Sequence, residues 1–150
     1  MTTASLWLSF MLLIAPREPD ERLHSVAQTV VEATSDPREQ ALLLTVSFYE
    51  TTWGRRGIPF GVSSLRRANP TPAECATFAL TILRRAQRMC PRSVAAQLGF
   101  YHHGRGCNPD RYSIAESVMV SRMQAWIANH GSSEVRWWPS LAFSVRWGHV

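Results

Sequence analysis

Proline-containing breaks divide the sequence into segments of helical length, and this division constrains the fold most strongly. The breaks are APREPDER, SDPREQ, GRRGIPFGVSSLRRANPTP and GRGCNPD. Proline interrupts a helix because it lacks the backbone N–H and clashes with the preceding turn. The segments between the breaks carry apolar residues at helical spacing, so we expect a mainly α fold, α+β at most.

Two helices are predicted between residue 19 and the long third break. The run DERLHSVAQTVVEAT starts at Asp20 with acidic residues in its first turn, where the helix dipole favours them. The next helix runs from about Pro37 to about Thr52, with Ser35 or Asp36 as its cap. A loop that contains a short hairpin is one expectation for the break that follows.

Three further helices are predicted after this loop. TPAECATFALTILRRAQRMC opens with a Thr71 cap, Pro72 and Glu74, which together form a helix-start signature. PRSVAAQLGFYHH and YSIAESVMVSRMQAWIANHG follow, and a glycine ends the last helix. The tail EVRWWPSLAFSVRWGHV alternates loosely, which suits either a strand pair or an irregular aromatic arm.

Residues 1–19 have two interpretations. The apolar run from Leu6 to Ala15 has the length of a signal-peptide core, but no Lys or Arg precedes it and no clear cleavage site follows. The run is also too short to span a bilayer as a helix. It is either a weak export signal or the first buried helix, and residues 20–150 form one compact domain.

The charged residues favour an anionic partner. Lysine is absent, and arginine alone gives the chain a formal net charge of +5. A nucleic acid, an anionic membrane or a bacterial wall polymer would suit this charge. The arginines are scattered in pairs, as at Arg55–Arg56 and Arg84–Arg85, and form no single helical stripe of the kind that a nucleic-acid surface favours.

Three cysteines are too few for a disulfide scaffold, and their odd number leaves at least one without an intramolecular partner. The pair we expect in an exported chain is Cys90 with Cys107, which would tie the end of one helix to the loop after the next. Cys75 would then be the cysteine outside this disulfide. Sequence alone does not fix this pairing.

One carboxylate, Glu50, ends the apolar run ALLLTVSFY and precedes Thr51, Thr52 and Trp53. At the C-terminal end of a buried helix, both the macrodipole and desolvation disfavour a negative charge and raise the pKa of a carboxyl. A carboxylic acid that keeps its proton suits general acid catalysis. The competing interpretation is a solvated residue at a helix end.

Several segments in sequence order resemble the lytic transglycosylase and goose-type lysozyme group. SFYETTWG is similar to the Glu-Ser stretch that ends its catalytic helix, and FGVSS stands where that group has GLMQ. LGFYHHGRG is similar to AAYNAGPG, and RYSIAESVMVSRMQAW resembles its closing Tyr-Val helix. The resemblance covers roughly residues 37 to 126 and implies a lysozyme-like helical domain with a loop or hairpin after the catalytic helix.

The resemblance implies cleavage of peptidoglycan glycan strands between MurNAc and GlcNAc. A single Glu acts first as acid and then as base, so Glu50 is the expected catalytic residue and no cofactor is needed. A periplasmic, extracellular or phage-associated location follows, and the lyase and hydrolase products stay open. The expected substrate-binding residues are Thr51, Phe60, Gly61, Val62, Ser63, Tyr101 and Tyr112.

This sequence departs from the group at several positions. Ser63 and Ser64 replace the usual Met-Gln, His102 replaces the Asn after the tyrosine, and the loop between Glu50 and Gly61 is shorter. These changes allow a second interpretation, a catalytically degenerate lysozyme-like protein with a structural role in a virion or cell envelope. A nucleic-acid-binding module is a third.

The stretch HHGRGCNPD also offers potential zinc ligands. His102, His103, Cys107 and Asp110 fit no established zinc spacing, and adjacent histidines on a helix point about 100° apart. We therefore expect no metal. Asp110 is the one acid considered in this loop as a possible substrate contact, and no second catalytic acid is evident.

Overall fold

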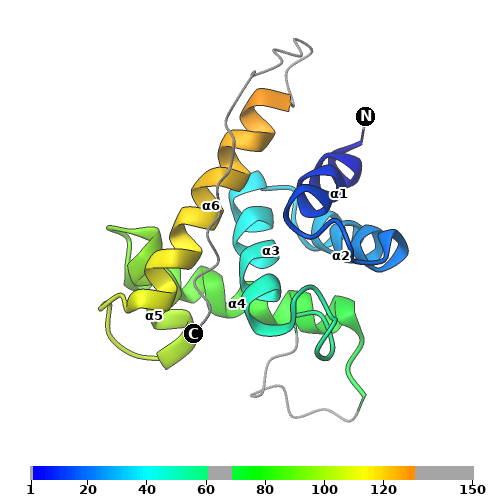
Figure 1. Ribbon diagram of the computed structural model, residues 1–150. Helices are drawn as coiled ribbons and strands as arrows, with labels where there is room; N and C mark the ends of the chain where they lie inside the picture. Colours follow the sequence, from blue (N-terminus) through cyan, green and yellow to red (C-terminus); the bar gives the residue numbers. More distant parts are fainter. Residues whose placement is uncertain (1, 61–68, 131–150) are drawn as a thin grey trace.

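The computed structural model describes residues 2–60 and 69–130. Within these ranges the chain forms helices and no strands (Figure 1), which confirms the mainly α prediction. The helices are α1 (Thr3–Ile14), α2 (Asp20–Ala33), α3 (Pro37–Thr51), α4 (Pro72–Met89), α5 (Val94–His103) and α6 (Arg111–His130). The strand pair or aromatic arm expected after α6 lies outside the described residues.

The helix starts agree with the capping residues read from the sequence. Asp36 caps α3 by accepting a 2.8 Å hydrogen bond from the backbone N–H of Arg38. At α4, Thr71 and Glu74 form a capping box in which each side chain accepts from the backbone of the other. These bonds satisfy N–H groups that the first helical turn leaves without a partner.

Helix α3 is the centre of the domain. In Figure 1 it runs between the α1–α2 pair and α6, and it contacts α2, α4 and α6. Its residues are buried continuously from Glu39 to Ser47, so nearly its whole circumference faces protein. A helix that is apolar all round can lie only in an interior. The C-terminal end of α3, with Glu50, is where it reaches the surface.

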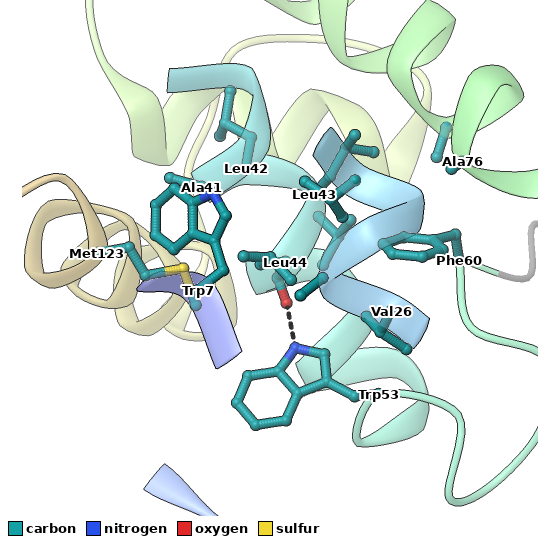
Figure 2. Close-up of a cluster of buried hydrophobic side chains, with 14 of the residues drawn as sticks. Trp7, Val26, Ala41, Leu42, Leu43, Leu44, Trp53, Phe60, Ala76 and Met123 are labelled. Atoms are coloured by element: carbon teal, nitrogen blue, oxygen red, sulfur yellow. Dashed lines mark hydrogen bonds between the residues drawn. The ribbon is translucent and has the colours of Figure 1, made fainter. Parts of the chain in front are cut away.

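Two tryptophans pack against α3 in the core and donate hydrogen bonds to it (Figure 2). The Trp53 indole is fully buried and donates a 2.9 Å hydrogen bond to the carbonyl of Leu44. Trp7 donates a 2.8 Å bond to the side-chain oxygen of Gln40. Each indole N–H thereby has an acceptor, which a buried polar group requires. Trp53 is therefore a core residue.

The first apolar segment forms α1, a helix of this core. Its buried residues include Trp7 and Phe10, and the Trp126 indole of α6 donates a 3.1 Å hydrogen bond to the carbonyl of Leu6. Residues Thr3–Ile14 are thus a helix that packs into the core. Within the described part of the chain, none of the helices combines the length and apolar character needed to cross a membrane.

A disulfide joins Cys90 to Cys107, with the two Cα atoms 5.5 Å apart, and this confirms the expected pairing. Cys75 is fully buried in the core. The loop that carries Cys107 also lies close against α5, because a Cβ added to Gly99 would stand 2.8 Å from the carbonyl oxygen of Asn108. The bridge and this close approach together hold the segment between α5 and α6 in place.

Candidate active site

A cleft of about 290 Å³ opens where α3 and α5 end and α6 begins. Its walls come from the ends of three helices that are far apart in the sequence. They carry an unusual density of ionisable side chains: Tyr49, Glu50, His102, His103, Asp110, Tyr112 and Glu116. Such a concentration of titratable groups in one concavity is typical of a functional site.

Helix α3 ends immediately after Glu50. Thr52 and Trp53 both take left-handed backbone conformations, with φ of 51° and 52°, and their N–H groups bond to the carbonyls of Phe48 and Ser47. Left-handed backbone is uncommon for residues other than glycine and is enriched where the surrounding structure requires it. The sharp stop leaves Glu50 at the mouth of the cleft.

The surroundings of Glu50 favour its neutral form. Desolvation by the adjacent protein raises the pKa of Glu50 to about 7, and the negative charge of Glu116 adds to this, while His102 acts in the opposite direction. The residue nevertheless remains accessible from the cleft. Glu50 is therefore an accessible carboxyl group with a raised pKa, the direction that the sequence predicts.

A second glutamate, Glu116, lies in the same cleft. Its side chain is 1% exposed, and its Oε2 accepts a 2.7 Å hydrogen bond from Nε2 of His102. This bond is the largest cause of the raised pKa of His102, which favours the imidazolium form. Glu116 and His102 therefore form a hydrogen-bonded ion pair beside Glu50.

Asp110 has a different environment from Glu50. Its Oδ1 accepts a 2.8 Å bond from the backbone N–H of Ser113, and its Oδ2 lies 2.8 Å from Nε2 of His103. These bonds lower the pKa of Asp110 to about 2, with the Ser113 backbone as the main cause. Asp110 is an ionised helix cap at neutral pH and has no proton to donate.

Tyr101 is 9% exposed and is not among the residues that line the cleft. Burial is the main cause of the raised pKa of its phenol, and the charges of Glu50 and Glu116 contribute, which places the ring near both carboxylates. Its hydroxyl is buried without a hydrogen-bond partner among the described residues. A buried hydroxyl with no partner is uncommon and costs free energy.

The structure brings some of the expected site residues together. Glu50 and Tyr112 line the cleft, and the Tyr101 phenol is near Glu50. Tyr112 is 58% exposed, so its ring is available to a ligand. Gly61, Val62 and Ser63 lie outside the described residues.

Two expected substrate contacts are corrected by the structure. The Phe60 ring is 0% exposed and belongs to the main apolar core, so the expectation that it stacks on a sugar is wrong. Thr51 is also buried; its hydroxyl donates to the carbonyl of Ser47 and accepts from the N–H of Gly54. Both side chains face the interior, Thr51 from the last turn of α3 and Phe60 from the segment after it.

The sequence did not predict three features of the cleft: the second carboxyl group of Glu116, its hydrogen bond to His102, and the exposed ring of Tyr49. Glu116 was detectable in principle, because it shares the inward face of α6 with Met119, Val120 and Met123. An ionisable residue on an apolar helical face is either paired or functional. The expectation that the cleft has no second acid is therefore corrected.

No group of three or more potential metal ligands gathers in a metal-binding arrangement within residues 2–60 and 69–130. A second depression, of about 390 Å³, lies on α4 and is lined by Ala73, Glu74, Thr77, Phe78 and Thr81. It offers a single carboxyl group for acid–base chemistry. The cleft around Glu50 is the better candidate active site.

Comparison of the chain with protein-family models, with curated proteins and with solved structures finds no match.

Proposed function

We propose that this protein cleaves the glycan strands of peptidoglycan, with Glu50 as the proton donor. The observation that carries the proposal is the raised pKa of Glu50, about 7, in a carboxyl group that is accessible from the cleft. The ordered resemblance of residues 37 to 126 to lytic transglycosylases and goose-type lysozymes supports the same residue.

The chemistry requires a proton at the leaving oxygen. As the bond from the anomeric carbon to this oxygen breaks, Glu50 transfers its proton to the oxygen and becomes a carboxylate. The sugar passes through a transition state with oxocarbenium character, which nearby negative charge stabilises. Glu50 suits this role because desolvation raises its pKa to about 7, so a large fraction of the protein carries this proton near neutral pH.

Two exposed tyrosines suit the recognition of a sugar chain. Tyr49 is 40% exposed and Tyr112 is 58% exposed, and both line the cleft beside Glu50. An aromatic ring offers an apolar face to the C–H groups of a sugar, while the phenol can bond to its hydroxyls. We assign them to substrate binding. Tyr101 is assigned to the orientation of Glu50.

The charge and the disulfide fit a peptidoglycan substrate. Bacterial wall material is anionic, and the chain has a formal net charge of +5. Disulfides such as Cys90–Cys107 persist mainly in oxidising compartments. A periplasmic, extracellular or phage-associated protein is consistent with both features.

A degenerate lysozyme-like structural protein is the second candidate. Ser63 and Ser64 stand where the resembling group has the Met-Gln that commonly contacts sugar, and this replacement favours loss of activity. In that case the cleft would bind glycan or a partner protein without cleaving it.

Incubation of the purified protein with purified peptidoglycan tests the proposal. We expect clearing in a zymogram and release of soluble fragments that mass spectrometry identifies as products of cleavage between MurNAc and GlcNAc. Absence of clearing on wall preparations from several bacterial classes would favour the structural candidate. A salt-sensitive gel shift with nucleic acid in place of clearing would favour a nucleic-acid-binding module.

A further inference from the structure

We propose that Glu116, held by His102, is a second catalytic carboxylate that activates water, so that cleavage ends in hydrolysis and leaves no anhydro sugar. This inference rests on the proposed function, because it concerns the outcome of the same reaction. It departs from the single-acid mechanism that the resemblance implies.

The position of Glu116 is the first argument. It lines the same cleft as Glu50 but comes from α6, whereas Glu50 comes from the end of α3. The two carboxyl groups interact electrostatically, since the charge of Glu116 contributes to the raised pKa of Glu50. Glycoside hydrolysis generally uses a pair of carboxyl groups, one as the acid and the other as base or nucleophile.

The burial of Glu116 is the second argument. Glu116 lies on the inward face of α6 with Met119, Val120 and Met123, and its side chain is 1% exposed. It is thus a charged residue among apolar core residues. A buried charge costs several kcal/mol, and an apolar pair of similar volume is often at least as stable. Packing alone therefore gives no reason for a glutamate here, whereas a role in the cleft does.

The unequal environments of the two carboxyl groups are the third argument. Desolvation raises the pKa of Glu50, while Glu116 makes its 2.7 Å hydrogen bond to His102, whose pKa this bond raises. One carboxyl group of the cleft is thus desolvated and the other has an imidazole partner. Neighbouring titratable groups with divergent environments indicate an acid and a base.

The step can be written with its atoms in balance. The proton of Glu50 moves to the leaving oxygen as the bond from that oxygen to the anomeric carbon breaks. A water molecule forms a new bond to the anomeric carbon through its oxygen, and the proton that it loses passes to the carboxylate of Glu116. The products are two sugar ends, one of them reducing. Glu116 then releases its proton to solvent and Glu50 takes one up from solvent, which restores both glutamates.

The chemistry of the product ends tests the inference on the wild-type protein. Hydrolysis gives reducing ends that borohydride converts to alditols, whereas an internal attack by the sugar gives anhydro ends that are one water lighter and resist borohydride. We expect reducing ends. Anhydro ends would overturn the role of Glu116 and leave the proposed function intact, whereas no cleavage of any wall preparation would overturn both.

Paired variants test whether Glu116 itself acts. Glu116→Gln keeps an acceptor for His102 but removes the base, so release of reducing ends should fall about 10²-fold or more. Glu39→Gln is the matched control, because Glu39 is also a buried carboxylate, paired with Arg84 at 2.7 Å, and it is not among the residues that line the cleft. Equal losses in the two variants would indicate a general effect of removing a buried charge and would overturn the inference.

Chemical rescue separates a catalytic role from a structural one. In Glu116→Ala, azide can replace the activated water, because its nitrogen needs no base to attack the anomeric carbon. We expect azide to restore cleavage and to yield glycosyl azides in the mass spectrum. A variant that keeps a cooperative melting transition but shows neither rescue nor an azide product would overturn the inference. If Glu116→Ala fails to fold, the same rescue in Glu116→Gln decides.

Discussion

Glu116 and His102 form a 2.7 Å hydrogen-bonded pair inside the cleft that Glu50 also lines. The pair places a partly exposed cation and a buried anion beside a carboxyl group that keeps its proton. The cleft thus has an acid, a carboxylate and an imidazolium supplied by the ends of α3 and α5 and by α6. The proposed reaction depends on these three groups, which come from helices far apart in the sequence.

Glu50→Gln should change how stability depends on pH. The folded-state pKa of Glu50 is about 7, above its ordinary value of 4.5, so the folded protein holds this proton more tightly than the unfolded chain. Stability is then lost as pH rises through the window between these values. The variant cannot lose a proton there, so its melting temperature relative to wild type should be higher at pH 8 than at pH 4. An unchanged difference across this range would contradict the environment described for Glu50.

Tyr101→Phe should reduce activity while leaving the fold intact. The Tyr101 hydroxyl has no partner among the described residues, so its removal sacrifices no hydrogen bond seen in the structure. Once Glu50 ionises during the reaction, we expect this hydroxyl to bond to it, a contribution of about 1 kcal/mol. The rate of wall clearing should fall by roughly five- to tenfold. A large drop in melting temperature would show instead that the hydroxyl has a structural role.

Loss of the disulfide should destabilise the domain. The bridge closes a loop with a sequence separation of 17 residues, for which the chain-entropy model gives about 3 kcal/mol. The double variant Cys90→Ser, Cys107→Ser should show this loss in urea unfolding, and wild type in reducing buffer should behave in the same way. Cys75→Ala in the same experiment controls for the loss of a buried sulfur. No difference between oxidised and reduced wild type would contradict the prediction.

Phe60→Ala should reduce stability, whereas Tyr112→Ala should reduce wall binding. Phe60 is fully buried, and removal of a core phenylalanine costs about 3–5 kcal/mol. Tyr112 is 58% exposed at the cleft, so its removal should leave the unfolding free energy within about 0.5 kcal/mol and weaken binding to purified wall. Urea unfolding and a wall pull-down measure the two effects. Reduced wall binding in Phe60→Ala at full stability would restore Phe60 as a substrate contact.

The helices could be predicted from the sequence because their signals are local. Asp36, Thr71 and Glu74 are short-range capping residues, and prolines mark the starts of α3 and α4. The apolar run before Glu50 is also a local signal, and it predicted a buried helix. The Cys90–Cys107 bridge could be expected for an exported chain, because each cysteine follows a helix end, although sequence alone does not fix the pairing.

The composition of the cleft was harder to predict because it depends on how helix ends meet. Glu116 stands 66 positions after Glu50 in the sequence, and no local pattern indicates that α6 brings the two together. The segment after α3 takes left-handed backbone at Thr52, Trp53 and Phe60, which these residue types do not favour, so no local pattern indicates that the Phe60 ring is buried. Long-range packing decides both.

The most direct measurement of the central claim is the clearing rate of Glu50→Gln on purified peptidoglycan. The amide keeps the shape of the side chain but has no proton to donate, so activity should fall by about 10²-fold or more while wall binding persists. Asp110→Asn is the matched control: Asp110 is ionised at neutral pH and acts as a helix cap, so its loss should cost far less activity. Near-normal clearing by Glu50→Gln, or abolition by Asp110→Asn alone, would contradict the assignment of Glu50 as the acid.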